Sequence, residues 1–136
     1  MPFLSENYHQ IRKLLDEKNV SLVAVSKFKS SDEIREAYEA GQYDFGENYV
    51  QELLDKQQQL PADIRWHFIG HLQSNKVKYI APFIYLIQSV DSEKLLQEIN
   101  KQGEKAGRKI ACLLQVHIAQ EETRRALGLD VENPYR

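Results

Sequence analysis

Apolar and polar positions along this chain form two alternating patterns, short continuous apolar runs and longer amphipathic stretches. Each run is too short for an independent helix and contains β-branched or aromatic residues, which predicts a buried strand. Between the runs, apolar residues recur every three or four positions, which predicts amphipathic helices, the first of them over 4–18. The apolar runs lie at 22–27, 43–46, 66–69, 84–90 and 110–118.

Polar residues at the starts of the amphipathic stretches predict where helices begin. Ser30 and Glu33 have the spacing of a capping box, so a helix is expected directly after residue 30, and Gly41 is expected to end it. Asn48 with Gln51 has the same spacing and predicts a second capped helix start.

The alternation of strands and helices determines the expected fold class. It predicts an α/β protein with a parallel sheet, either an open doubly wound sheet or a (β/α)-barrel, and right-handed crossovers suit both. A complete (β/α)₈ barrel takes about 250 residues. The 136 residues of this chain hold about five βα units, so we expect a single domain over 1–136 that is an incomplete barrel if the barrel alternative holds.

Composition narrows the function class. The net charge of −2 gives no basis for a nucleic-acid or anionic-membrane surface, and no apolar run approaches the length of a membrane span. The N-terminus lacks the features of a signal peptide, and the single Cys112 lies in an apolar run, where a buried thiol is expected. Together these features predict a cytoplasmic protein with neither nucleic acid nor membrane as a partner.

Polar side chains follow the predicted strands where each strand ends. Because the carboxyl ends of parallel strands meet at one edge, these groups are expected to form a pocket that holds an amine, a carboxylate, an amide and an imidazole. The groups are Ser26-Lys27, Glu47-Asn48, His67 with His71, and Gln115 with His117.

Lys27 has two interpretations. An amine at the end of a buried strand is poorly hydrated, which makes it a better nucleophile toward aldehydes. The alternative is a lysine that ends the strand by extending its ammonium into water.

The other polar residues also have structural alternatives. Asn48 could serve as a helix cap, and His67, between two aromatic residues, could be a satisfied half-buried histidine. The spacing of His67 and His71 spans a strand and a turn and lacks a matching cluster, so no metal site is predicted. The sequence also contains neither a G-x-G-x-x-G motif nor a Walker loop.

Three motifs in order carry a resemblance to a known family. They are Ala-Val-Ser-Lys at 24–27, Phe-Gly-Glu-Asn-Tyr-Val-Gln-Glu at 45–52, and Trp-His-Phe-Ile-Gly-x-Leu-Gln-x-Asn-Lys at 66–76. The chain resembles the pyridoxal phosphate homeostasis proteins, single-domain relatives of the alanine racemase barrel, over about residues 4–123.

The resemblance implies a (β/α)₈ barrel that holds pyridoxal 5′-phosphate as a Schiff base. Lys27 matches the lysine that forms it, and Asn48 and His67 are the candidates to flank or orient the ring. The family implies cofactor homeostasis, without an assigned catalytic residue. Two alternatives stay open: an enzyme of the alanine racemase type, and a truncated form that no longer binds cofactor and associates with itself.

The sequence departs from the family toward its end. Barrels of this type place phosphate on loops after strands seven and eight, and this chain ends before them. Residues 124–136 also differ from the family pattern. We therefore expect a C-terminally truncated member with weak cofactor attachment, whose unpaired sheet edges lead either to homo-oligomers or to a marginally folded chain.

Overall fold

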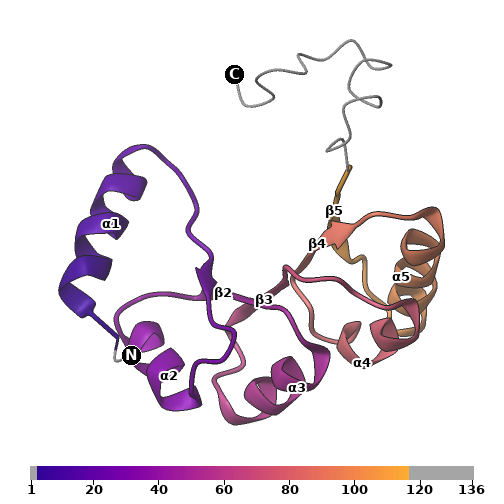
Figure 1. Ribbon diagram of the computed structural model, residues 1–136, viewed down its shortest axis with the longest axis horizontal. Helices are drawn as coiled ribbons and strands as arrows, with labels where there is room; N and C mark the ends of the chain where they lie inside the picture. Colours follow the sequence, from indigo (N-terminus) through magenta and orange to yellow (C-terminus); the bar gives the residue numbers. More distant parts are fainter. Residues whose placement is uncertain (1–2, 117–136) are drawn as a thin grey trace.

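The computed structural model describes residues 3–116 and forms one parallel sheet with helices (Figure 1). This arrangement confirms the predicted α/β class. In chain order the elements are α1 (Ser5–Glu17), β1 (Ala24–Val25), α2 (Ser31–Glu39), β2 (Asp44–Glu47), α3 (Val50–Gln59), β3 (Arg65–Phe68), η1 (Ser74–Lys76), α4 (Val77–Ile80), β4 (Leu86–Val90), α5 (Glu93–Lys105) and β5 (Ala111–Leu114).

The order of the strands distinguishes between the two predicted architectures. The described strands lie in the sheet in the order β1-β2-β3-β4-β5, and every neighbouring pair is parallel. A doubly wound sheet reverses its strand order at a switch point, whereas a barrel adds each strand to the same edge. Helices α2 to α5 all lie on one side of the sheet (Figure 1), so the fold is a partial (β/α)-barrel, as predicted.

The hydrophobic core fills the space between the sheet and helices α2 to α5. Strand residues alternate between the two faces of the sheet, and every second one points toward these helices. The largest fully buried side chains in this layer include Phe45, Leu53, Phe68, Ile80, Ile84 and Ile87.

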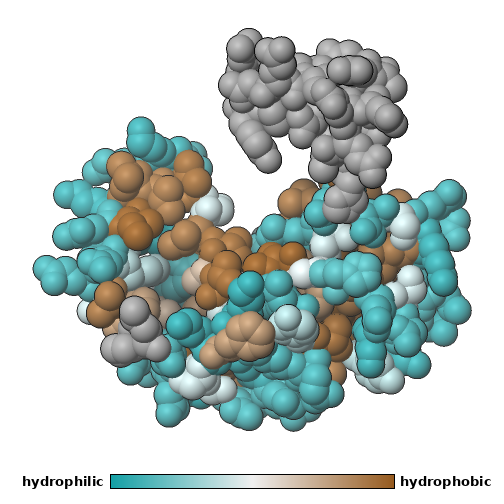
Figure 2. All heavy atoms as spheres, viewed as in Figure 1, coloured by the Kyte–Doolittle hydropathy of each residue, from teal (hydrophilic) through white to brown (hydrophobic). Residues whose placement is uncertain are grey.

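The opposite face of the sheet is concave and open. Val25 in β1 is 55% exposed, and Leu113 in β5 is 51% exposed. Figure 2 shows apolar surface along the sheet between α1 and α5, whereas the outer surfaces of the helices are mostly hydrophilic. Among the described strands, β1 and β5 each pair with one neighbour, so each presents a free edge.

Helix starts follow the sequence prediction in one case and differ from it in another. The Glu33 amide donates to Ser30 Oγ at 3.1 Å, which confirms the first capping residue, and Gly41 has the positive φ of +106° expected after a helix. The second prediction is wrong, because α3 begins one residue later than expected. Its N-cap is Tyr49, and no described side chain caps it, so Asn48 remains at the end of β2.

The last predicted strand is shorter than expected within the described part of the chain. It covers Ala111–Leu114, and Cys112 is half-buried rather than fully buried. The predicted strand end at 117–118, including His117, and the tail at 124–136 lie outside the described residues. None of the helices in residues 3–116 combines the length and apolar character that crossing a membrane requires.

We predict that Leu53→Ala in α3 lowers the free energy of unfolding by about 2–5 kcal/mol, because it leaves a cavity in the core. Leu53 has no exposed surface, whereas Leu14 in α1 is 52% exposed. The matched substitution Leu14→Ala is therefore expected to change stability by less than about 1 kcal/mol. Urea denaturation of both variants measures the difference, and equal losses would contradict the assignment of the core.

Candidate functional site

Lys27 lies at the carboxyl end of β1, directly after the last ladder bond of that strand. The Ser26 amide donates to the Gly46 carbonyl at 2.9 Å, which extends the parallel ladder by one residue. The Ser26 side chain faces the helices, where its hydroxyl donates to Glu47. Lys27 lies in the turn that follows and is exposed, as expected for a lysine that extends its ammonium into water rather than for a poorly hydrated amine.

The residue after Lys27 has an unusual backbone conformation. Phe28 has a φ of +63°, in the left-handed region that non-glycine residues rarely adopt. Its amide donates to Glu52 Oε2 at 2.6 Å, and its exposed ring lies 5.6 Å from the ring of Tyr49. The Lys29 amide closes the turn with a 3.0 Å bond to the Ser26 carbonyl. Lys27 thus lies within a tight, non-repetitive turn.

A buried charged cluster lies beneath this turn, on the helix side of the sheet. The Lys56 ammonium donates to Glu52 at 2.7 Å, to Glu47 at 2.9 Å and to the Ser26 carbonyl at 2.7 Å. Burial raises the pKa of Glu47 above its usual value, although the hydrogen bonds from Ser26 and Lys56 oppose the shift. The carboxylate that the sequence grouped with the pocket therefore faces α3.

The backbone of Asn48 lies close to that of Gly70. A Cβ added at Gly70 would lie 2.8 Å from the Asn48 carbonyl oxygen and 2.9 Å from its Cα, so only glycine fits there. The side-chain Oδ1 of Asn48 is buried and has no hydrogen-bond partner among residues 3–116. A buried acceptor without a partner is uncommon, and it is available to a ligand donor.

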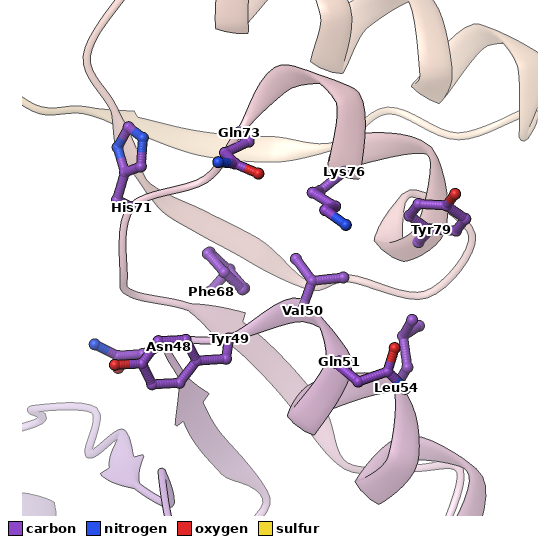
Figure 3. Close-up of a pocket in the computed structure, with 10 residues that line it drawn as sticks. All are labelled: Asn48, Tyr49, Val50, Gln51, Leu54, Phe68, His71, Gln73, Lys76 and Tyr79. Carbon is purple, nitrogen blue, oxygen red and sulfur yellow. The ribbon is translucent and has the colours of Figure 1, made fainter.

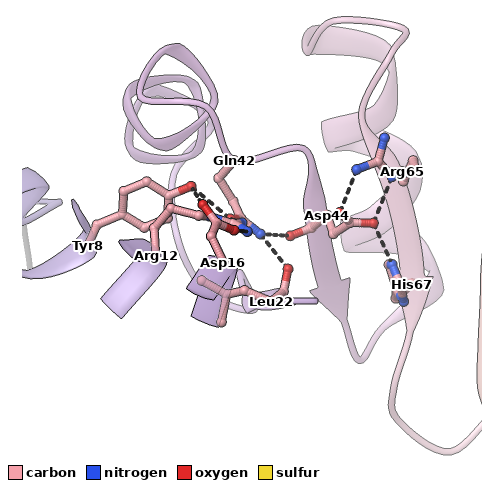
Figure 4. A network of polar contacts seen from close by, with 8 residues as sticks. All are labelled: Tyr8, Arg12, Asp16, Leu22, Gln42, Asp44, Arg65 and His67. Atoms are coloured by element: carbon pink, nitrogen blue, oxygen red, sulfur yellow. Dashed lines mark hydrogen bonds and ion pairs between the residues drawn. The ribbon is translucent and has the colours of Figure 1, made fainter. Parts of the chain in front are cut away.

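His67 is buried, and both of its ring nitrogens have partners. Nε2 bonds to Asp44 Oδ1 at 3.0 Å, and Nδ1 bonds to the Gln88 side-chain nitrogen at 3.0 Å (Figure 4 shows the Asp44 bond). Asp44 also accepts two hydrogen bonds from Arg65, at 2.9 and 2.7 Å. His67 is thus a buried histidine with all its hydrogen bonds made, as the structural alternative from the sequence predicted. These bonds fix the imidazole on the concave side of the sheet.

A second network attaches α1 to the sheet at the same level (Figure 4). The buried amide of Gln42 accepts from Tyr8 at 2.9 Å and from Arg12 at 2.6 Å. The same amide donates to the carbonyls of Leu22 at 2.8 Å and Asp44 at 2.7 Å. Gln42 therefore connects α1, the segment before β1, and β2.

A pocket of about 780 Å³ opens between α3 and α4, next to Asn48 (Figure 3). Its polar lining includes His71, Gln73 and Lys76, which come from the third sequence motif. Neither Lys27 nor His67 lines it. The predicted groups therefore lie in separate places. His67 lies on the concave face, Glu47 lies in the buried cluster, and Asn48 and His71 line this pocket.

Some residues around the site were not singled out from the sequence. Asp44 and Arg65 share a face with His67. Strand alternation could have identified them, because Asp44 pairs with Arg65 across the sheet and Arg65 lies two residues before His67. Glu52 and Lys56 have the four-residue spacing of a helical ion pair, but that spacing usually marks an exposed pair. The described residues contain no cluster of three or more histidine, cysteine or acidic residues that could hold a metal ion.

Comparisons with known proteins identify several relatives. The family model "Alanine racemase, N-terminal domain" matches residues 3–129. A pyridoxal phosphate homeostasis protein of Schizosaccharomyces pombe is 44% identical over 117 residues, which cover 85% of this chain and 49% of that protein. The human protein of the same name is 41% identical over 115 residues, which cover 78% of this chain and 42% of that protein.

A solved structure of a related protein has a similar fold. PipY of Synechococcus elongatus with pyridoxal phosphate bound is 38% identical, with a TM-score of 0.78 over 90% of this chain and 60% of that chain. The chain spans about half the length of the curated relatives that it matches.

We predict that Asp44→Asn lowers the free energy of unfolding at pH 7 by about 1–3 kcal/mol, because it removes a charged hydrogen-bond acceptor. Burial tends to raise the pKa of Asp44, but the bonds from Arg65 and His67 outweigh it, so the pKa is lowered. The stabilisation from ionised Asp44 is therefore present above the unfolded-state pKa of about 3.9 and is lost as the pH falls through the lower folded-state pKa.

Urea denaturation at pH 7 and at pH 3 tests this dependence, and the difference between wild type and Asp44→Asn should shrink at the lower pH. Asp16→Asn is the control, since Asp16 is exposed and makes one long contact of 3.4 Å with Arg12. A deficit for Asp44→Asn that is independent of pH would contradict the prediction.

Proposed function

This chain belongs to the alanine racemase N-terminal domain family, and from that premise we propose that it binds pyridoxal 5′-phosphate in intracellular cofactor homeostasis. The observation that carries the proposal is the exposed amine of Lys27 at the carboxyl end of β1. Ligands of (β/α)-barrels bind at this edge. The pyridoxal phosphate homeostasis proteins and PipY with pyridoxal phosphate bound support the choice of cofactor.

The chain's own residues fit an aldehyde cofactor in three respects. Lys27 would hold the cofactor through its side-chain amine, which would form a C=N bond with the aldehyde carbon and release water. The buried Asn48 Oδ1 accepts a hydrogen bond from the bound molecule, because no described protein group occupies it. His67 is fixed by Asp44 and Gln88, so its ring provides a rigid side of the site.

We assign no catalytic activity to the chain. When bound, pyridoxal phosphate supplies an electron-poor ring, and a racemase-type reaction needs in addition an acid or base near the substrate α-carbon. The imidazole of His67 is a poor candidate for that role, since both of its nitrogens are already bonded. The curated relatives are named for cofactor homeostasis rather than for a reaction.

We predict that pyridoxal phosphate, followed by borohydride reduction, modifies Lys27 in a saturable manner. Lys27→Met should abolish this modification, because it removes the amine directly after β1. Lys29→Met is the matched control, since Lys29 is exposed two residues further along the same turn. Peptide mapping by mass spectrometry identifies the modified residue. Weak labelling spread equally over many lysines would contradict the proposed function.

We further propose that copies of the chain associate through the free edges of the sheet, and that the chain acts in the cytoplasm. Unpaired strand edges expose backbone donors and acceptors that pair readily with another chain. The apolar side chains of Val25 and Leu113 lie exposed on these same two edge strands. The single cysteine of the sequence cannot form an intramolecular disulfide, which is consistent with a reducing compartment.

We predict concentration-dependent sedimentation of the wild type as a mixture of monomers and oligomers. Val25→Lys should shift the mixture toward the monomer, because a charge on an edge strand disfavours pairing. Ile11→Lys places the same charge on a residue of similar exposure in α1 and should leave the distribution unchanged. A single monomeric species at all concentrations would contradict the association.

A further inference from the structure

The turn that carries Lys27 is held from both sides by side chains of α3. On one side, Lys56 Nζ donates to the carbonyl of Ser26 at 2.7 Å. On the other side, Glu52 Oε2 accepts from the amide of Phe28 at 2.6 Å. The two bonds attach to the residues directly before and after Lys27, so they fix its backbone without contacting its side chain.

The two anchoring side chains are themselves joined. Lys56 and Glu52 form an ion pair at 2.7 Å, and Lys56 also contacts Glu47 at 2.9 Å. The three donors of the ammonium are thus matched by three acceptors, with the Ser26 carbonyl as the third. The Lys56 side chain is 7% exposed and that of Glu47 has no exposed surface, so water screens this pair little, whereas the Glu52 side chain is 22% exposed.

The cluster is not explained by stability alone. A buried ion pair is often no more stabilising than apolar residues of similar volume, because both charges lose their hydration. One oxygen of Glu47, Oε1, is also buried without a hydrogen-bond partner among residues 3–116. Apolar residues at positions 52 and 56 could not make the hydrogen bonds to the Ser26 carbonyl and the Phe28 amide.

The backbone of Phe28 needs such support. Its φ of +63° is unfavourable for a side chain with a Cβ, and strained conformations persist where their surroundings hold them. The bond from its amide to Glu52 is the side-chain contact that holds this backbone next to Lys27.

We propose that Glu52 and Lys56 are positioning residues that hold the 26–28 turn, and thereby present the Lys27 amine to an aldehyde at the carboxyl edge of the sheet. This inference rests on the proposed function for the role of Lys27. In this proposal the buried cluster fixes the position of the Lys27 backbone. Asn48 and His67 lie beside the ligand.

The test compares Glu52→Ala, Glu52→Gln and the control Asp55→Asn in the full chain. Asp55 is an exposed carboxylate on the same helix, one residue before Lys56, and it accepts a hydrogen bond from Gln51 at 3.1 Å. Hydrogen exchange at the Phe28 amide is measured without cofactor. Modification of Lys27 is measured by pyridoxal phosphate and borohydride over a range of pH, with denaturation of each variant to check its folding.

We expect Glu52→Ala to speed exchange at Phe28 by about tenfold and to weaken modification of Lys27 by a similar factor. Glu52→Gln keeps an acceptor for the Phe28 amide, so it should restore most of both signals, and Asp55→Asn should match the wild type. The pH at which half of Lys27 is modified should shift in Glu52→Ala alone.

Two results would overturn the inference. One is unchanged exchange at Phe28 in Glu52→Ala, and the other is faster exchange with unaltered pH dependence of Lys27 modification. Failure of the proposed function is a separate outcome, because the wild type itself would then lack specific modification at Lys27. In that case acylation of the lysines by acetic anhydride replaces the cofactor, and an unchanged ratio of Lys27 to Lys29 labelling in Glu52→Ala would also overturn the inference.

Discussion

Each strand of this parallel sheet must turn alternate side chains toward two different environments, and this constraint determines the role of every residue near the site. One face packs against helices α2 to α5, and the other is open. Ser26 and Glu47 fall on the packed side, where they join a buried cluster. His67 falls on the open side, and Lys27 lies in the exposed turn after β1. A shift of one residue in β1 would exchange the faces of Val25 and Ser26 and separate the Ser26 hydroxyl from Glu47.

The two faces cooperate at the carboxyl edge. The open face offers reactive and polar groups, while the packed face supplies the contacts that fix the backbone beneath them. Lys56 is the connection between the two, since its ammonium reaches from α3 to the Ser26 carbonyl at the end of β1. A similar division applies at His67, whose ring is oriented by Asp44 and Gln88 from neighbouring strands.

The sequence predicted the order of elements and the fold class because these depend on local periodicity, and the capping role of Ser30 followed from the same local reasoning. The predicted capping role of Asn48 was wrong, since the extended backbone at Tyr49 delays the start of α3. Glu47 was grouped with the ligand pocket because the prediction used its place at a strand exit and not its face. The part played by Lys56 depends on a contact 30 residues away in the chain, which no local pattern reveals.

The attachment of α1 has a consequence for the dynamics of the chain. Helix α1 lies apart from the helices that cover the sheet (Figure 1), and its polar link to the rest of the fold passes through the single amide of Gln42. Within α1, only Tyr8 is fully buried. An element held by so few buried contacts opens at a lower free energy than the core. We therefore expect helix α1 to open at a lower free energy than the unfolding of the five-stranded sheet.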